Sequence, residues 1–298
     1  MSIKNITKDS MENKRILILG SKGMLGQELV NVFSCDKQYT VIGWDMENIN
    51  VTDFVVAEES IRAVAPEIII NAVAYNAVDK CEESEEEYTK AMILNAEAPK
   101  FLARLTKEMN AIFVHYSTDY VFDGERSDGY DENEKPKPLS RYGESKWRGE
   151  GNVLLADGKS YIVRLSKLFG KRGASGIAKK SFFDTMLGVA KTEEIVQVVD
   201  DEKSCFTYAP DLAQATKNLI ESESSFGVYH LTNSGAVTWY EALQELYTQA
   251  KIGVTIQPVG SDVFPRKALR PKCSMLLNTK RPALRSYQEA LREYLKNI

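Results

Sequence analysis

Short apolar runs alternate with helix-like segments through the first half of the chain. The apolar runs predict buried strands at residues 15–19, 39–43, 67–74, 111–117 and 161–165. Segments with helical periodicity or helix-forming composition lie between them, at residues 24–33, 58–64, 96–109 and 140–155. Continuous apolar runs indicate strands that are covered on both faces. Strand and helix repeated in this order predict an α/β fold with a doubly wound parallel sheet.

The second half is less regular. Helices are predicted at residues 177–190, 211–220, 239–250 and 286–296, with strands at 195–199 and 228–231. We therefore expect three parts: a flexible extension at 1–13, the parallel-sheet domain at 14–166 and a smaller lobe formed mainly by 167–298. The lobe is expected to be interleaved with the first domain, which also takes in parts of about 177–250. The acidic run at 82–87 predicts the solvated start of a helix.

Composition narrows the class of protein. The chain has 298 residues, of which 43% are hydrophobic, enough for a large core. Lys and Arg number 38 against 42 Asp and Glu, so the net charge of −4 gives no bulk attraction to nucleic acid or to an anionic membrane, and neither partner is expected. No apolar stretch approaches the ~20 residues of a membrane span, and the polar start lacks a signal peptide, which predicts a cytoplasmic protein.

The four cysteines lie far apart and form no C-x-x-C pair. This spacing gives little support to disulfides or to zinc, so we predict reduced, buried thiols and no metal site.

Two glycine motifs share one spacing. In "LILGSKGMLGQELV", Gly20, Gly23 and Gly26 follow the first predicted strand and open a helix. Such glycines let the backbone approach a diphosphate at the start of the helix. Asp45 ends the second strand 25 residues after Gly20 (45 − 20) and can bind the ribose hydroxyls of a dinucleotide. This context predicts a Rossmann-type site for NADH or NADPH. Asp45 favours tolerance of NADH, because it would repel a 2′-phosphate, an effect that Lys22 would partly offset.

The second motif, "GKRGASG", places Gly170, Gly173 and Gly176 after the fifth strand. Two interpretations stay open: a mobile glycine loop, or a clamp in which Lys171 and Arg172 hold a substrate phosphate. If the first motif is the cofactor turn, Gly23→Val should abolish dinucleotide binding and Gly173→Val should not.

Polar residues follow the fourth strand in "STDYVFDG", at the sheet edge where ligands bind in parallel α/β folds. Thr118 stands in this stretch, and "RYGESK" then places Tyr142 and Lys146 four residues apart, on one face of a helix. A lysine ammonium beside a phenol favours the phenolate and lowers the tyrosine pKa. The same Tyr-x-x-x-Lys pattern recurs at Tyr247 and Lys251, where no strand-end hydroxyl precedes it.

Glycine turn, strand-end threonine and Tyr-x-x-x-Lys together resemble the extended short-chain dehydrogenase/reductases. Within that group the chain is similar to the dTDP-4-dehydrorhamnose reductases over nearly its whole length. The resemblance rests on "GSKGMLG", "IIINAVAYNAVDKCE", "HYSTDYVFDG", "YGESK", "GVYHLTNSG", "TWYEAL" and "RPKCSMLLNTK".

The resemblance implies hydride transfer to the 4-keto group of a nucleotide-linked 6-deoxy sugar, most directly dTDP-4-dehydro-L-rhamnose to dTDP-L-rhamnose. It makes Thr118 the hydrogen-bond partner of the carbonyl, Tyr142 the proton donor, and Lys146 the residue that binds nicotinamide ribose and lowers the tyrosine pKa. Implied cofactor-binding residues are Gly20, Lys22, Gly23, Met24, Leu25, Gly26, Asp45, Asn50, Val51, Ala72, Val73, Ala74, Tyr142 and Lys146. Implied substrate-binding residues are Asn76, Val78, Asp119, Tyr120 and Lys167. A nucleotide-diphosphate sugar is thus the expected partner, and a homodimer is left open.

Three departures from the family pattern fall on the expected sugar side. Lys167 stands in "RLSK" where the family has a tryptophan that packs on the sugar, Asn76 replaces a threonine, and "DEKSCFT" at 201–207 lacks the usual glycine and proline. Two alternatives therefore remain: a related nucleotide-sugar reductase, epimerase or dehydratase that acts on another sugar, and a non-catalytic dinucleotide-binding regulatory subunit.

Overall fold

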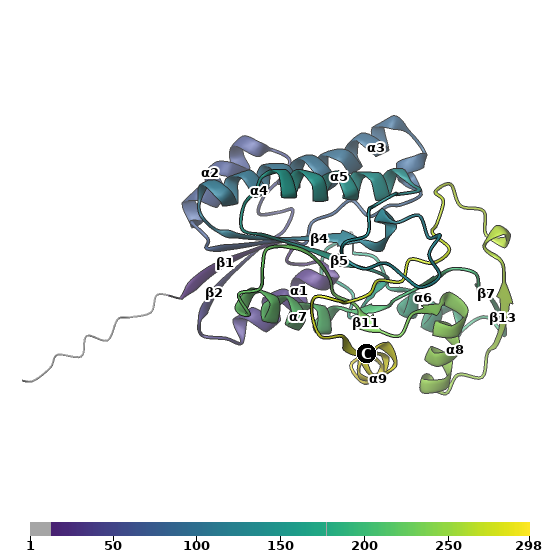
Figure 1. Ribbon diagram of the computed structural model, residues 1–298. Coiled ribbons are helices and arrows are strands. Elements are labelled where there is room, and N and C mark those ends of the chain that lie inside the picture. Colours follow the sequence, from purple (N-terminus) through teal and green to yellow (C-terminus); the bar gives the residue numbers. More distant parts are fainter. Residues whose placement is uncertain (1–12, 177) are drawn as a thin grey trace, which may run out of the picture.

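A six-stranded parallel sheet forms the centre of the protein (Figure 1). The computed structural model describes residues 13–176 and 178–298. The expected extension at 1–13 lies almost wholly outside the described residues. The strand order is β10-β5-β4-β3-β1-β2, and each neighbouring pair is parallel. The strands are β1 (Lys14–Leu19), β2 (Tyr39–Trp44), β3 (Ile68–Asn71), β4 (Ile112–Thr118), β5 (Ser160–Leu165) and β10 (Gly227–His230).

Helices cover both faces of this sheet (Figure 1). One face carries α1 (Met24–Ser34) and α7 (Ala209–Glu221), whose apolar residues share one core with alternate residues of the strands. The other face carries α2 (Phe54–Val64), α4 (Ala98–Glu108) and α5 (Arg141–Leu155) around a second core. The two cores explain why the strands read as continuous apolar runs, because both faces of each strand are buried. The predicted doubly wound α/β fold is confirmed.

Local boundaries differ from the predictions in a few places. Helix α2 begins four residues earlier than predicted, where the Asp53 side chain accepts a hydrogen bond from Val56 N at 3.3 Å. Strand β3 ends at Asn71, so the predicted strand at 67–74 was too long. The acidic run does open a helix, α3 (Glu85–Met92), capped by Ser84. Between α3 and α4 the chain forms a π-helical turn, η2 (Ile93–Glu97), which the sequence pattern did not indicate.

The second half of the chain contributes to two regions. Strand β10 extends the large sheet beside β5 and α7 covers one face of that sheet, while most of the other elements build a lobe with a largely aromatic core. Its main elements are α6 (Phe182–Val189), α8 (Trp239–Ala250), α9 (Tyr287–Lys296), and the parallel pair β7 (Ile195–Val199) and β13 (Thr255–Val259). Short strands and turns complete the described chain: β6 (Leu168–Phe169), β8 (Lys203–Ser204), β9 (Thr207–Tyr208), β11 (Asn233–Ser234), β12 (Val237–Thr238), β14 (Leu284–Ser286), η1 (Lys80–Glu82), η3 (Asp119–Val121) and η4 (Ser261–Val263).

The helix predicted at 177–190 starts later than expected. Residue 177 lies outside the described residues, and α6 begins only at Phe182. Ser181 caps this helix in a capping box with Asp184, which satisfies the free backbone N–H groups at its start.

The prediction of four buried thiols was wrong in part. Cys81 and Cys205 are buried, whereas Cys35 is exposed and Cys273 is partly exposed, and all four are free. Across residues 13–176 and 178–298, no helix is both long and apolar enough to span a membrane.

Candidate active site

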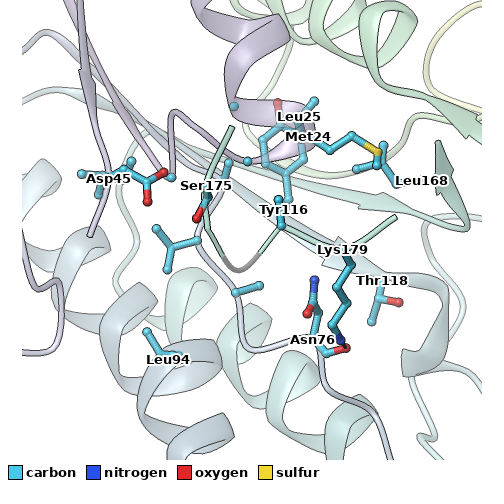
Figure 2. Close-up of a pocket in the computed structure, with 18 of the residues that line it drawn as sticks. Met24, Leu25, Asp45, Asn76, Leu94, Tyr116, Thr118, Leu168, Ser175 and Lys179 are labelled. Atoms are coloured by element: carbon cyan, nitrogen blue, oxygen red, sulfur yellow. Dashed lines mark hydrogen bonds between the residues drawn. The ribbon is translucent and has the colours of Figure 1, made fainter. Parts of the chain in front are cut away.

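A cavity of about 690 Å³ lies at the carboxyl ends of the central strands. Its walls come from the ends of β1, β2, β3, β4 and β5, the start of α1 and the loop before α6 (Figure 2). In an open parallel sheet this edge is where ligands bind, and the volume is within the ordinary range of a small-molecule site.

The first glycine motif forms a tight turn between β1 and α1. Gly20 N donates to Trp44 O at 2.8 Å, and Gly23 N donates to Gly20 O at 3.0 Å. A Cβ atom on Gly26 would lie 2.0 Å from Gly20 O, so no side chain fits there. The turn exposes the start of α1 to the cavity, with Gly23 as its N-cap. This cradle fits a dinucleotide diphosphate, which would lie against free backbone N–H groups.

Asp45 lies beside this turn and is nearly buried. Its carboxylate accepts hydrogen bonds from Lys22 N and Met46 N, each at 2.9 Å. The Lys22 ammonium pairs instead with Glu47, so it does not neutralise Asp45. Asp45 therefore keeps its negative charge beside the glycine turn, where it would oppose a 2′-phosphate.

Thr118, Tyr142 and Lys146 meet at one wall of the cavity. Thr118 ends β4, while Tyr142 and Lys146 lie one turn apart on α5. Lys146 Nζ is buried and donates to Tyr116 O at 2.6 Å, which fixes the ammonium next to the strand that carries Thr118. The three predicted catalytic residues are thus brought together by the packing of α5 against β4.

The pKa of Tyr142 differs from the prediction. Burial raises the pKa of Tyr142, and a hydrogen bond to Thr118 offsets this only in part. Burial also lowers the pKa of Lys146 to about 8. The expected lowering of the Tyr142 pKa by Lys146 is not what the chain's own residues produce. A raised pKa keeps the phenol protonated at neutral pH, which is the form that a proton donor needs.

Asn95 supports this wall from behind, and the sequence patterns did not single it out. It is fully buried in η2, and its amide donates to Ser145 Oγ and to Tyr75 O, each at 2.9 Å. Its carbonyl oxygen accepts from Tyr75 N at 2.9 Å. Asn95 therefore joins α5, one residue before Lys146, to the loop after β3. The signal in the sequence that could have indicated Asn95 was an asparagine inside a mainly apolar helical segment.

Asp119 and Tyr120 follow Thr118 at the far end of the cavity. Asp119 is buried and accepts from Ser274 Oγ at 2.6 Å and from Thr118 Oγ1 at 3.1 Å. Burial raises the pKa of Asp119 to about 6 despite these hydrogen bonds. The Tyr120 ring packs edge-on against Tyr142, with 6.0 Å between ring centroids. Both residues thus pack beside Thr118 and Tyr142, and Asp119 also faces the cavity.

Lys167 lines the same end of the cavity, but its amine is buried. Its Nζ is buried, has no hydrogen-bond partner among the described residues, and lies 3.8 Å from the ring centroid of Trp239 and 5.0 Å from that of Phe206. Burial lowers the pKa of Lys167 to about 7. The lysine at this position therefore sits over an aromatic surface supplied by the lobe and does not point to solvent.

The cavity collects most of the predicted site residues. Those that line it are Gly20, Gly23, Met24, Leu25, Gly26, Asp45, Asn50, Val51, Ala72, Val73, Ala74, Asn76, Thr118, Asp119, Tyr142, Lys146 and Lys167. Lys22, Val78 and Tyr120 are not among its lining residues in the part of the chain that the structure describes. The second Tyr-x-x-x-Lys pattern, Tyr247 and Lys251, does not line the cavity. Tyr247 OH donates to Met186 O at 3.1 Å, and Lys251 is the C-cap of α8.

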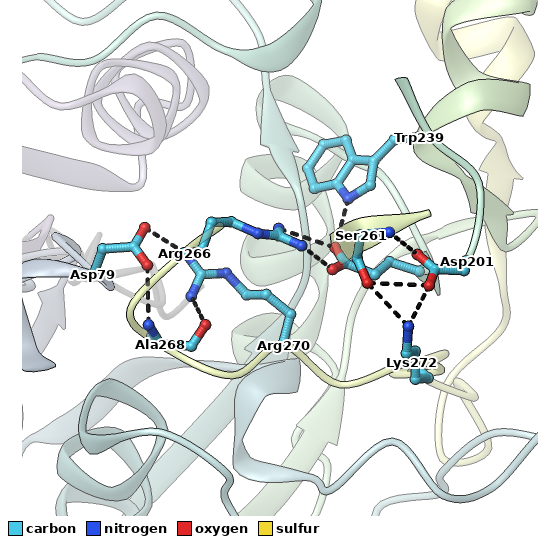
Figure 3. A network of polar contacts seen from close by, with 9 residues as sticks. Asp79, Asp201, Trp239, Ser261, Arg266, Ala268, Arg270 and Lys272 are labelled. Atoms are coloured by element: carbon cyan, nitrogen blue, oxygen red, sulfur yellow. Dashed lines mark hydrogen bonds and ion pairs between the residues drawn. The ribbon is translucent and has the colours of Figure 1, made fainter. Parts of the chain in front are cut away.

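A polar cluster joins the segment at 266–272 to Asp79 and to the stretch at 201–207 (Figure 3). Arg270 pairs with Asp79 at 2.7 Å, while Arg266 pairs with Glu202, which also accepts from Trp239 Nε1 at 3.1 Å. Trp239 is the ring beneath Lys167. The stretch at 201–207, which departs from the family pattern, therefore contacts Lys167 directly through Phe206 and also reaches it through Glu202 and Trp239.

Known proteins resemble the chain over nearly its whole length. The family model described as "RmlD substrate binding domain" matches residues 14–298. The spore coat polysaccharide biosynthesis protein SpsK of Bacillus subtilis (strain 168) is 33% identical over 288 residues, 95% of this chain and 97% of that protein. A dTDP-4-dehydrorhamnose reductase of Aggregatibacter actinomycetemcomitans is 33% identical over 277 residues, 89% of this chain and 91% of that protein. The crystal structure of a dTDP-4-dehydrorhamnose reductase from Bacillus anthracis in complex with NADP has a TM-score of 0.90 and 31% identity, and the match covers 96% of this chain and 100% of that one.

Proposed function

The chain belongs to the RmlD substrate binding domain family, and on this premise we propose that it is an NAD(P)H-dependent reductase of a nucleotide-linked 4-keto-6-deoxy sugar. The substrate proposed first is dTDP-4-dehydro-L-rhamnose, which the reaction converts to dTDP-L-rhamnose. The observation that carries the proposal is the meeting of Thr118, Tyr142 and Lys146 in the cavity that the glycine turn also lines.

A bound dinucleotide would supply the hydride, and the residues of the chain do the rest of the work. The glycine turn and the start of α1 would hold its diphosphate, with Asp45 at the adenosine ribose and Lys146 at the nicotinamide ribose. With the dinucleotide held at these points, its nicotinamide ring would lie near Lys146, and the keto sugar would lie next to Thr118. The cofactor half of the cavity thus sets the position of the reacting carbon.

Proton transfer falls to Tyr142. As hydride reaches the carbonyl carbon, negative charge grows on the carbonyl oxygen, and the Thr118 hydroxyl would turn its proton from Asp119 to donate a hydrogen bond to this oxygen. Tyr142 then gives its proton to this oxygen, a contribution of roughly 10²–10⁴-fold. Burial, which raises the pKa of Tyr142, keeps the proton in place until that charge appears.

The substrate side supports a second candidate, the reduction of a different nucleotide-linked keto sugar. We propose that Asn76, Val78, Asp119, Tyr120 and Lys167 contact or shape the site of the sugar. Lys167 carries a buried amine where the family has a flat aromatic ring, and Trp239 lies behind that amine. This replacement changes both the charge and the shape that the sugar meets. It favours a different sugar over a different reaction, because the catalytic trio is complete.

The test is turnover with defined substrates. NADH and NADPH oxidation would be followed with dTDP-4-dehydro-L-rhamnose and with other dTDP-4-keto-6-deoxyhexoses, and each product identified by NMR. Reduction at C4 that depends on Tyr142 supports the proposal. Binding of NADH without turnover of any of these sugars would favour the regulatory subunit, and exchange of ring protons without net NADH oxidation would favour an epimerase.

A further inference from the structure

The second glycine motif is docked on the first. Gly173 packs so closely on the cofactor turn that a Cβ atom there would lie 2.5 Å from Lys22 O and 2.8 Å from Gly23 C. Ser175 N donates to Lys22 O at 3.1 Å, and Gln27 Nε2 donates to Lys171 O at 2.9 Å. The segment at 170–176 is therefore packed against the glycine turn, and Gly173 meets Gly23, which lies 150 positions earlier in the chain (173 − 23).

The same connection reaches the other wall of the cavity through Lys179. Lys179 Nζ donates to Asn76 O, on the loop after β3, at 3.1 Å. Figure 2 shows the Lys179 side chain extending toward Asn76, with Thr118 nearby. Lys179 lines the cavity, as do Ser175 and Ala178, whereas Lys171 and Arg172 do not line it within the described residues. A clamp formed by Lys171 and Arg172 is therefore not what the fold presents.

Lys179 is an exposed residue whose ammonium forms no ion pair among the described residues. No carboxylate of the described residues lies within 4.0 Å of its Nζ, and its hydrogen bond goes to a neutral carbonyl. Desolvation lowers the pKa of Lys179 and repulsion from Lys80 adds to this, while attraction to Cys81 and Asp79 offsets part of the effect. An ammonium held between two walls of a ligand cavity, with another lysine nearby, attracts an anion.

We propose that Lys179 binds a phosphate oxygen of a ligand that enters this cavity. The proposal rests on the proposed function, which brings two diphosphates to the site: that of the nucleotide sugar and that of the dinucleotide. Lys179 lines the cavity together with the glycine turn and Asn76, so either diphosphate could reach it. In both cases the contact would be between one phosphate oxygen and one lysine ammonium. Docking of Gly173 and Ser175 on the turn gives this lysine a defined position relative to the bound cofactor.

Binding of dTDP and of NADH distinguishes the phosphate of the nucleotide sugar from that of the dinucleotide. Binding of dTDP and of NADH to the full chain would be measured by calorimetry at low ionic strength, with thymidine as a probe that lacks phosphate. Lys179→Gln is expected to weaken one of the two diphosphate ligands about tenfold and to leave thymidine unchanged, as removal of one charge-assisted hydrogen bond requires. Lys179→Arg should keep most of the affinity because it retains the charge.

Lys171→Gln is the matched control, an exposed lysine of the same segment that does not line the cavity. Loss of dTDP affinity alone assigns the nucleotide-sugar phosphate, and loss of NADH affinity alone assigns the dinucleotide phosphate. Affinities for both within about twofold of wild type would overturn the inference, as would an equal loss in the Lys171→Gln control. Because dTDP carries no sugar, a protein that binds it through Lys179 but reduces no keto sugar would refute the proposed function and leave this inference standing.

Discussion

Replacing Lys167 by methionine tests whether the buried lysine amine lowers the free energy of unfolding. The Lys167 Nζ is buried against Trp239 and Phe206 without a hydrogen-bond partner among the described residues. Methionine has a similar length and a polarizable end that packs well on aromatic rings. We therefore expect Lys167→Met to unfold with a larger free energy than wild type at neutral pH.

The magnitude follows from the pKa. A Lys167 pKa lowered from 10.5 to about 7 corresponds to a cost of ~5 kcal/mol, at ~1.4 kcal/mol per pH unit. The cation–π contact with Trp239 and solvent near the side-chain stem offset part of this, so the expected gain is about 1–3 kcal/mol. Between pH 7 and 10.5 the unfolded chain keeps a proton that the folded chain has released, so the stability of wild type rises with pH in this window. The advantage of methionine should shrink accordingly.

Urea unfolding of wild type and Lys167→Met at pH 7, 8, 9 and 10 measures this effect, with the exposed Lys191→Met as control. The gain should be largest at pH 7 and small at pH 10, and the control should show neither. A gain that does not vary with pH, or a less stable variant at pH 7, would refute the reasoning. The same variant should bind NADH normally and show a KM for the sugar raised by roughly tenfold, as loss of one charge-assisted contact predicts.

Three further predictions concern the cofactor and the proton. Tyr142→Phe should lower turnover about 10²-fold or more with NADH binding unchanged; turnover within about tenfold of wild type would remove Tyr142 as proton donor. The contacts of Gly173 reverse the expectation from the sequence for Gly173→Val: this variant should weaken NADH binding roughly tenfold or more, because its side chain would collide with the glycine turn. Gly176→Val, with open space around it, should not, and equal affinities would contradict the docking. Asp45→Asn should shift the ratio of kcat/KM values toward NADPH by about tenfold in steady-state assays, and an unchanged ratio would show that Asp45 does not select the cofactor.

Local patterns were sufficient to predict the parts of the fold that depend on neighbours in the sequence. Runs such as Ile16 to Leu19 are apolar on both faces because helices cover both sides of the sheet, so the strand was visible in the sequence alone. The four-residue spacing of Tyr142 and Lys146 fixes one face of a helix for the same local reason. Strand polarity then places Thr118 at the ligand edge, since parallel strands end together.

Tertiary structure alone decided the contacts between distant segments. Nothing near Gly173 in the chain indicates that it packs on Gly23, and nothing near Lys179 indicates Asn76, because these pairs meet only after the lobe docks on the sheet. The direction of Lys167 depends on Trp239, which lies 72 positions later in the chain (239 − 167). The pKa of Tyr142 likewise follows from burial among many segments, and one neighbouring lysine does not set it. Periodicity is a property of adjacent residues, whereas solvation and charge at this site are set by the whole set of segments that surround it.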